Sequence, residues 1–226
     1  MSGPTEARDA TSAADWRNFV PRVVAENLEA GAKHFHKREK PVAVLFADIA
    51  GCTRLCEALP PEVMNALTET YFARFFDAVQ DLGGTINEIM GDGFMAIFQM
   101  DEVSSSAANA ACAALGVREA TATPPDAFRH LRTEVHVGIH AGRAHVGYTR
   151  FRARGWERWT YTASGPVTNV AARLCNHADP GQILVSSDLT RMLGGSFEFE
   201  FVGDLVLKNV SSTVRAYNLV SGRVEA

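Results

Sequence analysis

The segment TINEIMGDGFMAIF, residues 85–98, contains two short apolar stretches joined by a glycine-flanked turn. The flanking stretches are rich in β-branched and large apolar residues, and the GDG between them signals a tight turn, so the segment predicts a β-hairpin. Asp92 lies at the tip of this hairpin, and Glu88 lies four residues earlier in its first strand. Both carboxylates require an explanation, because their neighbours are residues typical of a buried sheet.

The segments around the hairpin predict a sheet with helices packed against it. Upstream, the run 42–48 (VAVLFAD) is typical of a strand buried on both faces, and residues 61–84 have the apolar spacing of a helix closed by two glycines. Downstream, residues 104–120 predict a helix rich in small side chains. The order β-α-β-β-α-β across 42–147 predicts an α/β chain of the α+β kind, with a ferredoxin-like split βαβ mixed sheet and flanking helices.

The C-terminal part predicts further elements of both kinds. Residues 165–178 have the pattern of a helix. Strands are expected at 133–142, 143–147, 158–164, 182–186, 197–203, 204–209 and 214–220, and an arginine-rich arm at 148–157 separates the second of them from the third.

Length and composition predict one folded domain with an extension. The chain has 226 residues, of which 46% are apolar and 21% charged, which is ample for a large core. Residues 1–40 are interpreted as a disordered start followed by a helix from Trp16 to about Lys40, and residues 41–226 as the main domain.

Charge and hydropathy argue against several partners. The net charge of −4 gives no general attraction to nucleic acid or to an anionic membrane. No apolar run approaches the ~18 residues of a membrane span, and the N-terminus lacks the pattern of a secretory signal. We therefore expect a cytoplasmic protein with no nucleic-acid or membrane partner.

Two aspartates are expected to converge at one edge of the sheet. Asp48 ends the first strand and Asp92 occupies the hairpin tip, and these two elements are neighbours in the predicted fold. Two carboxylates held close repel each other, and a divalent cation relieves that repulsion. Mg²⁺ or Mn²⁺, which prefer oxygen ligands and often bind one or two carboxylates plus substrate phosphates, fit such a pair. An aspartate that merely makes a turn is the alternative for Asp92 taken alone.

A second pair of polar residues is predicted on a helix. Asn169 and Arg173 are four residues apart and therefore share one helix face. An amide and a guanidinium together can hold a ribose oxygen and a phosphate. Such pairs are also common on solvated helix faces.

Four segments, taken together and in this order, resemble the signature blocks of the class III nucleotide cyclase catalytic domain. They are VLFADIAGCTRLCE (44–57), IMGDGFMAIF (89–98), GIHAGRAHVG (138–147) and GPVTNVAARL (165–174). The resemblance covers about residues 41–220. It implies an enzyme that converts a nucleoside triphosphate to a 3′,5′-cyclic monophosphate and pyrophosphate, and a head-to-tail homodimer with active sites at the interface.

The resemblance also implies roles for individual residues. Asp48 and Asp92 would bind two divalent cations, Mg²⁺ or Mn²⁺, with help from the carbonyl of Ile49. Asn169 would orient the ribose and Arg173 would stabilise the transition state. The sequence match further assigns Lys208 to the triphosphate.

The base-reading position of this family falls on Glu88. Guanylate cyclases usually carry Glu at this position, and adenylate cyclases usually carry Lys. The partner position holds Thr162, and threonine at that position is common in adenylate cyclases. A carboxylate only accepts hydrogen bonds, so it suits guanine N1–H and N2–H₂, or uracil N3–H read together with a donor such as Thr162 or Arg158. Adenine is the poorest fit.

The domain organisation is similar to that of bacterial pyrimidine cyclases, and the arginine-rich arm just before Thr162 is unusual among purine cyclases. We therefore expect UTP as the substrate and cyclic UMP as a second messenger in antiphage defence. A guanylate cyclase is the first alternative and an adenylate cyclase the second. A catalytically degenerate domain, serving in dimerisation or nucleotide sensing, is an alternative of another class.

Overall fold

The computed structural model describes residues 16–31, 36–131 and 133–223. Its helices are α1 (Arg22–Glu29), α2 (Cys52–Ala58), α3 (Pro61–Gln80), α4 (Val103–Ala122), α5 (Pro166–His177) and α6 (Ser187–Leu193). Its strands are β1 (Arg38–Ile49), β2 (Gly84–Met90), β3 (Gly93–Phe98), β4 (Val135–Ala153), β5 (Trp156–Ser164), β6 (Ile183–Ser186), β7 (Phe197–Leu205) and β8 (Val214–Gly222). Short 3₁₀ turns occupy Trp16–Phe19, Asp126–Phe128 and Gly194–Ser196.

All strands belong to a single mixed sheet. Its order is β2-β3-β1-β4-β6-β8-β7, and β5 pairs with β4 beside this path. The first four strands, β2-β3-β1-β4, pair with one another antiparallel and are linked through α3 and α4 in the order β-α-β-β-α-β. This arrangement confirms the predicted α+β fold with a ferredoxin-like split βαβ core.

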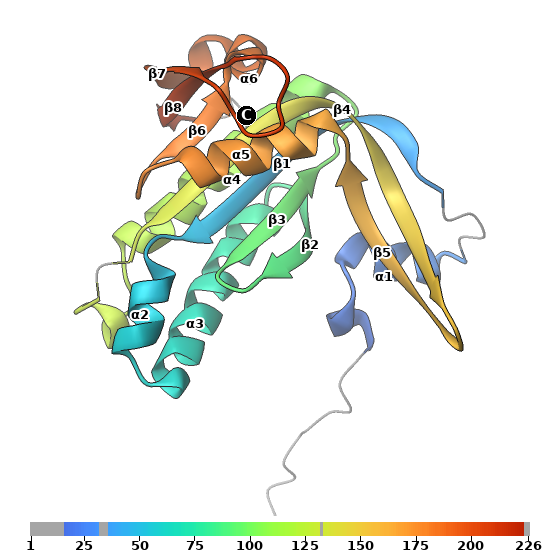
Figure 1. The fold of residues 1–226 in the computed structure, drawn as a ribbon, viewed down its shortest axis with the longest axis horizontal. Coiled ribbons are helices and arrows are strands. Elements are labelled where there is room, and N and C mark those ends of the chain that lie inside the picture. Colours follow the sequence, from blue (N-terminus) through green and yellow to red (C-terminus); the bar gives the residue numbers. More distant parts are fainter. Residues whose placement is uncertain (1–15, 32–35, 132, 224–226) are drawn as a thin grey trace, which may run out of the picture.

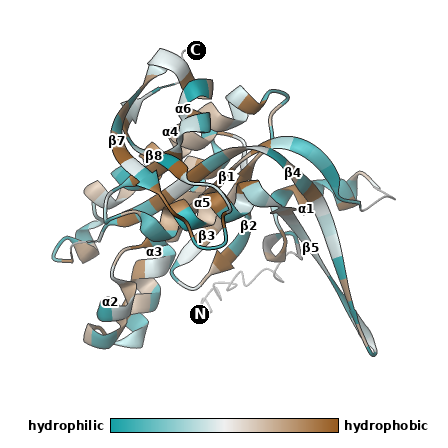
Figure 2. Cartoon of the chain, turned by 45° about the horizontal axis from the view of Figure 1, so that its top comes forward, coloured by the Kyte–Doolittle hydropathy of each residue, from teal (hydrophilic) through white to brown (hydrophobic). Residues whose placement is uncertain are grey.

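Two faces of the sheet are covered by different helices. Helices α3 and α4 lie behind the sheet in Figure 1, and α5 crosses in front of its upper part. Behind the sheet, Phe72, Phe75 and Phe94 pack ring against ring, with centroids 6.0 to 6.2 Å apart. Buried alanines line the inner face of α4, which lets this helix lie close to its neighbours. In Figure 2 the central strands carry the brown, hydrophobic colour expected of a sheet buried between helices.

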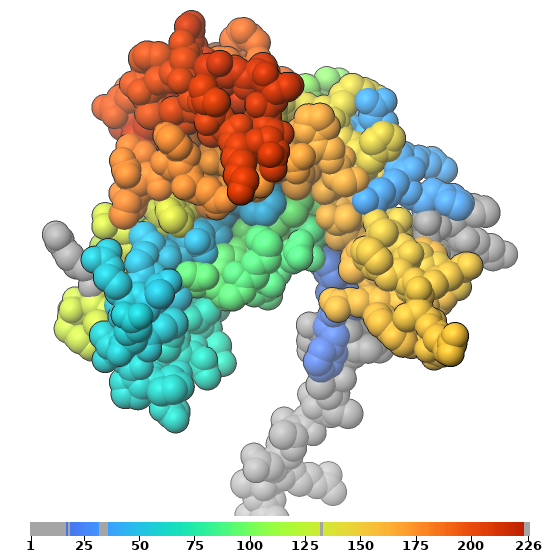
Figure 3. Space-filling model, viewed as in Figure 1, coloured from blue at the N-terminus to red at the C-terminus, as the bar shows by residue number. Residues whose placement is uncertain are grey.

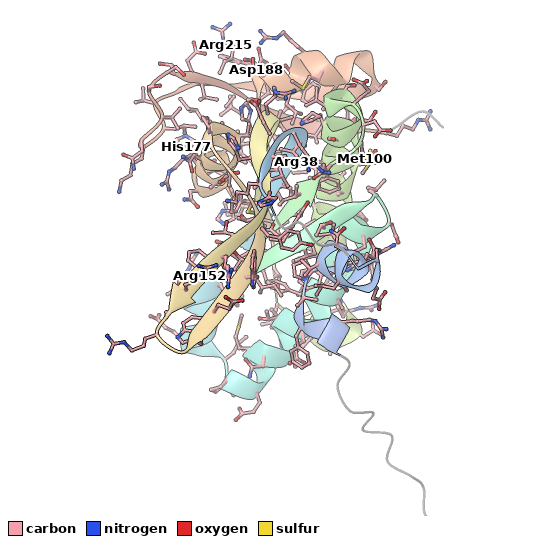
Figure 4. All side chains as sticks on the ribbon, turned by 90° about the vertical axis from the view of Figure 1, so that its right-hand side faces the viewer. Arg38, Met100, Arg152, His177, Asp188 and Arg215 are labelled. Carbon is pink, nitrogen blue, oxygen red and sulfur yellow. The ribbon has the colours of Figure 1, made fainter. Side chains whose placement is uncertain are left out.

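The end of β2 that leads to the hairpin turn is exposed, whereas every side chain of β3 is buried. Below α5, the sheet lies open between α2 and α3 on one side and the β4–β5 hairpin on the other (Figure 1). The space-filling view shows the molecule hollowed at this place (Figure 3). The β4–β5 hairpin projects from the sheet as an arm, along which Arg152 lies (Figure 4). Three exposed apolar residues beside this place, Ile89, Phe151 and Trp156, are therefore available to a second molecule.

The N-terminal helix is shorter than the sequence pattern predicts. Helix α1 ends at Glu29, and residues 38–40, which the prediction placed in the helix, begin β1. The pairing of Arg38 with Val146 explains the difference, because long-range sheet pairing overrides the local helical pattern. The expected disordered start lies outside the described residues, and the division of the chain at residue 40 stays a prediction. Of the described helices, none combines the length and apolar character that crossing a membrane requires.

Four further features differ from the sequence prediction. The strands expected at 133–142 and 143–147 are one strand, β4, which also forms the first half of the arginine-rich arm. Helices α2 and α6, each seven residues long, were not predicted because they are too short to show a clear period. Lys208 lies in the loop after β7 and not in a strand.

Gly138 on β4 determines how closely α5 packs on the sheet. A Cβ atom added there would lie 2.1 Å from the backbone nitrogen of Cys175 and 2.3 Å from the carbonyl oxygen of Ala171, both on α5. Backbone atoms of a helix cannot move aside singly. We expect Gly138→Ala to lower the free energy of unfolding by about 3 kcal/mol, the upper end of overpacking effects, as measured by urea denaturation.

Gly142→Ala is the matched control for this substitution. Its Cβ would meet only the Cγ2 of Val167, at 3.0 Å, and a side-chain methyl can shift. Equal stability of the two variants would contradict the close-packing argument.

Candidate active site

Asp48 and Asp92 lie side by side, as the sequence predicts. Asp48 stands opposite Gly93 in the register of β1 and β3, and Asp92 is in the turn between β2 and β3. The backbone N–H of Ile49 donates to the carbonyl oxygen of Asp92 at 3.0 Å, which joins the end of β1 to the turn. The side chain of Ile49 is buried in the core.

Glycines on both sides of Asp92 make this arrangement possible. Gly91 has φ +64°, a left-handed conformation that glycine adopts without strain. A Cβ atom on Gly93 would lie 2.7 Å from Oδ1 of Asp48 and 2.8 Å from the carbonyl oxygen of Ala47. The space beside the Asp48 carboxylate is therefore kept free by the absence of a side chain at Gly93.

His136 contacts Asp48, and no local sequence pattern predicts this contact. It stands opposite Asp48 in the register of β1 and β4, with Nε2 3.2 Å from Oδ2 of Asp48 and Nδ1 3.2 Å from the carbonyl oxygen of Ala178. The hydrogen bond with the Asp48 carboxylate raises the pKa of His136 above its usual value. Antiparallel pairing of the two strands was the signal that could have found it.

Cys52, at the start of α2, lies against Asp92. Burial, together with a hydrogen bond to Asp92, raises the pKa of this thiol to about 12. Its sulfur is 3.9 Å from that of Cys56. Together with Met64 and Asp92, these residues line a cavity of about 510 Å³ between α2, α3 and the hairpin turn.

Glu88, Arg158 and Thr162 line one cavity, between β2 and β5. The cavity measures about 730 Å³ and is also lined by Asn87, Ile89, Phe151, Trp156, Thr160 and Tyr161. Glu88 is exposed, whereas Thr162 is half-buried and donates to its neighbouring carbonyl, that of Ala163, at 3.2 Å. Burial raises the pKa of Tyr161 to about 12, and its hydroxyl donates to Gln99. The three residues predicted to face a base thus come together.

Arg173 and Lys208 also come together, at α5. The Nε–H of Arg173 donates to the backbone carbonyl of Lys208 at 3.2 Å. Asn169, one turn earlier, is exposed and lines a polar cavity of about 430 Å³ that the loop after Lys208 also borders. The buried face of α5, opposite these polar groups, packs on the sheet through Val167, Val170, Ala171, Leu174 and Cys175.

The predicted site residues therefore form three groups, and each group lines a cavity of its own. Asp92 belongs to the cavity beside α2, Glu88 to the cavity beside β5, and Asn169 to the cavity beside α5.

The aspartate pair fits a divalent cation in its chemistry. Within the described ranges, no cluster of three or more His, Cys, Asp and Glu side chains is arranged to hold a metal ion. Two carboxylates with open space beside one of them, created by Gly93, nevertheless match a cation that takes its remaining ligands from water and substrate phosphates. Asp48 and Asp92 are the residues that would hold it.

Comparison with known proteins identifies the family. The family model described as "Adenylate and Guanylate cyclase catalytic domain" matches residues 35–221. The chain belongs to this family. It is a nucleotide cyclase catalytic domain of class III, as its four sequence blocks predict.

Cyclases of several organisms are similar to this domain. Adenylate cyclase 1 of Rhizobium meliloti is 30% identical over 214 residues, which is 89% of this chain and 31% of that protein. The terminal-differentiation specific adenylate cyclase of Dictyostelium discoideum is 29% identical over 194 residues, 82% of this chain and 9% of that protein. The chain thus spans less than a third of either relative.

Solved cyclase structures share the fold. The adenylyl cyclase CyaB from P. aeruginosa has a TM-score of 0.76 at 27% identity, covering 83% of this chain and 97% of that one. The guanylate cyclase domain of RhGC from Catenaria anguillulae, solved in complex with GTP, has a TM-score of 0.72 at 20% identity, covering 82% and 100%. The fold is therefore shared with a domain named as an adenylyl cyclase and with one named as a guanylate cyclase.

Proposed function

We propose that this cyclase domain acts as a homodimer and converts a nucleoside triphosphate, with UTP preferred, to its 3′,5′-cyclic monophosphate and pyrophosphate. The separation of the aspartates, the base cavity and the α5 group into three cavities supports a site shared by two chains. One chain would supply Asp48 and Asp92, and its partner Glu88, Asn169 and Arg173. A closed two-fold dimer then carries two equal sites.

The residues divide the reaction between them. The ribose 3′-oxygen attacks the α-phosphorus in line, the bond to the bridging oxygen breaks, and pyrophosphate leaves. Two divalent cations, when bound to Asp48 and Asp92, would lower the pKa of the hydroxyl and neutralise phosphate charge. The Asn169 amide holds the ribose, the Arg173 guanidinium faces the charge that develops on the α-phosphate, and Lys208 binds the triphosphate.

The preference for UTP rests on Glu88. Its carboxylate lies in the same cavity as Arg158 and Thr162, so an acceptor and two donor groups can meet the edge of one base. Uracil offers an N–H between two carbonyls, which matches this set. Guanine fits the carboxylate as well and is the first alternative.

Replacing Glu88 by lysine tests this assignment. In Glu88→Lys a charged donor faces the N–H of uracil or guanine, and that group is left unpaired in a closed site. We expect kcat/KM for UTP and GTP to fall about 10- to 100-fold, and acceptance of ATP relative to both to rise, because adenine ring nitrogens accept hydrogen bonds.

Glu119→Lys on α4 makes the same charge change at an exposed site on the opposite side of the sheet. It should leave the order of substrates unchanged. If Glu88→Lys left the order of kcat/KM among the nucleoside triphosphates unchanged, Glu88 would not take part in base recognition.

The relatives named adenylate cyclases favour ATP as a further alternative. If the unmodified protein cyclised ATP and none of the other three nucleoside triphosphates, ATP would be the substrate. A degenerate module that only dimerises or senses nucleotides is the alternative of another class. Binding of nucleotide without release of pyrophosphate would identify it.

A role of cyclic UMP in antiphage defence, inside the cytoplasm, completes the proposal. It rests on the similarity to bacterial pyrimidine cyclases. Cells carrying the intact protein should accumulate cyclic UMP on phage infection, and cells carrying Asp92→Asn should not; no rise in the intact strain would contradict this role.

A further inference from the structure

An irregularity in β2 lies directly beside Glu88. Strand β2 pairs with β3 in regular register up to Ile86 opposite Ala96, and the next pair is Glu88 opposite Met95. Asn87 is therefore an extra residue without a partner position on β3. This is a β-bulge, a feature that is enriched next to active sites and redirects side chains there.

The bulge places two consecutive side chains on one face. Strict alternation after Ile86, which packs against the core below α3, would put Asn87 on the front face and turn Glu88 backward. Because of the extra residue, Glu88 shares the face of its partner Met95. The amide Nδ2 of Asn87 lies 3.6 Å from Sδ of Met95, so Asn87 is on that face too. Both residues line the cavity between β2 and β5.

The fold makes little use of the Asn87 amide. Within the described residues, its Nδ2 has one hydrogen-bond partner, the thioether sulfur of Met95. A thioether sulfur is a weak acceptor. Its Oδ1 is buried and has no hydrogen-bond partner in the described part of the chain. The amide is therefore held by no strong hydrogen bond within the described residues, and its N–H groups can donate to a ligand in the adjoining cavity.

The two side chains together have a definite hydrogen-bonding pattern. A carboxylate accepts, and an amide both donates and accepts. An acceptor beside a donor complements a base edge in which an N–H adjoins a carbonyl. Uracil and guanine have that edge, whereas the corresponding edges of adenine and cytosine carry an amine beside an unprotonated ring nitrogen.

We propose that Asn87 is a second specificity-determining residue of the cyclase site, donating from its amide to the base carbonyl next to the N–H that Glu88 accepts. The assignment rests on the proposed function, since it needs a nucleoside triphosphate in the cavity between β2 and β5. It also explains the bulge, because the bulge lets one strand present both the acceptor, Glu88, and the donor, Asn87, to the same base edge.

The test compares Asn87→Ala and Asn87→Asp with the unmodified enzyme on all four nucleoside triphosphates in Mn²⁺. For Asn87→Ala, kcat/KM for the preferred substrate among UTP and GTP should fall about tenfold or more, and that for ATP by less than about threefold. The loss should be greater for Asn87→Asp, because a carboxylate then faces the base carbonyl. Binding of the 3′-deoxy analogue of the preferred substrate, which cannot cyclise, should weaken in parallel.

Deletion of Asn87 provides a second variant in which Glu88 keeps its place. Ile86 and Glu88 already pair with consecutive residues of β3, so the deletion makes the strand regular and leaves Glu88 on the cavity face. It should fold, and lose base discrimination as Asn87→Ala does. Thr85→Ala, on the same strand and opposite Ile97, is the matched control and should keep the order of substrates.

Three results would overturn the assignment. They are an unchanged ratio of UTP or GTP to ATP in Asn87→Ala, a parallel loss on all four substrates, and a preference of the unmodified enzyme for ATP. If the unmodified protein cyclises no triphosphate, the proposed function fails and the Asn87 assignment fails with it. An active enzyme with unchanged discrimination in the variants overturns the Asn87 assignment alone.

Discussion

Cyclisation should fall about 1,000-fold or more when either Asp48 or Asp92 is replaced by asparagine. Each replacement removes one carboxylate charge from the place where a divalent cation would neutralise the phosphates, an effect worth several kcal/mol in the transition state. The shapes of the side chains are kept, so the backbone bond from Ile49 to Asp92 should remain. Pyrophosphate release in Mn²⁺ or Mg²⁺ measures the loss.

Asp101→Asn is the matched control, because this aspartate is exposed in the loop after β3. It should keep full activity, and all three variants should unfold at similar urea concentrations. Near-normal turnover by Asp48→Asn or Asp92→Asn would mean that these carboxylates do not bind the catalytic cations.

Two inactive variants should restore each other's activity when they are mixed. Asp48→Ala removes the aspartate side of a shared site, and Arg173→Ala removes the α5 side. In a heterodimer of the two, one site carries both defects and the other carries neither. A statistical mixture contains half heterodimers, so about a quarter of the unmodified activity should return.

Differently tagged chains, refolded or co-expressed together and purified by both tags, give the heterodimer directly. Its activity should be about half that of the unmodified dimer. Inactive heterodimers, shown by both tags to have formed, would place each site within a single chain.

The sequence predicts the hairpin and the strand that carry the two aspartates because both are short-range patterns. Glycines around Asp92 and the apolar run before Asp48 are local signals, and the structure joins the two elements as expected. The Asn169 and Arg173 pair follows in the same way from the period of α5.

Features that depend on pairing between distant segments could not be predicted in this way. The contact of His136 with Asp48 follows from the register of β4 on β1, and the bulge at Asn87 follows from the register of β2 on β3. Residues 38–40 lie in a strand and not in the predicted helix for the same reason, because they pair with β4. Local pattern carries no information on register, which the partner strand determines.

Product analysis of the unmodified protein tests the central claim most directly, namely that this domain is a cyclase whose Glu88 accepts from a base N–H. Purified protein is incubated with Mn²⁺ and each of ATP, GTP, CTP and UTP separately, and the products are identified by mass spectrometry. We expect cyclic UMP as the main product, cyclic GMP second, and little cyclic AMP or cyclic CMP. Cyclic AMP as the main product, with UTP and GTP untouched, or no cyclic product from any substrate, would contradict it.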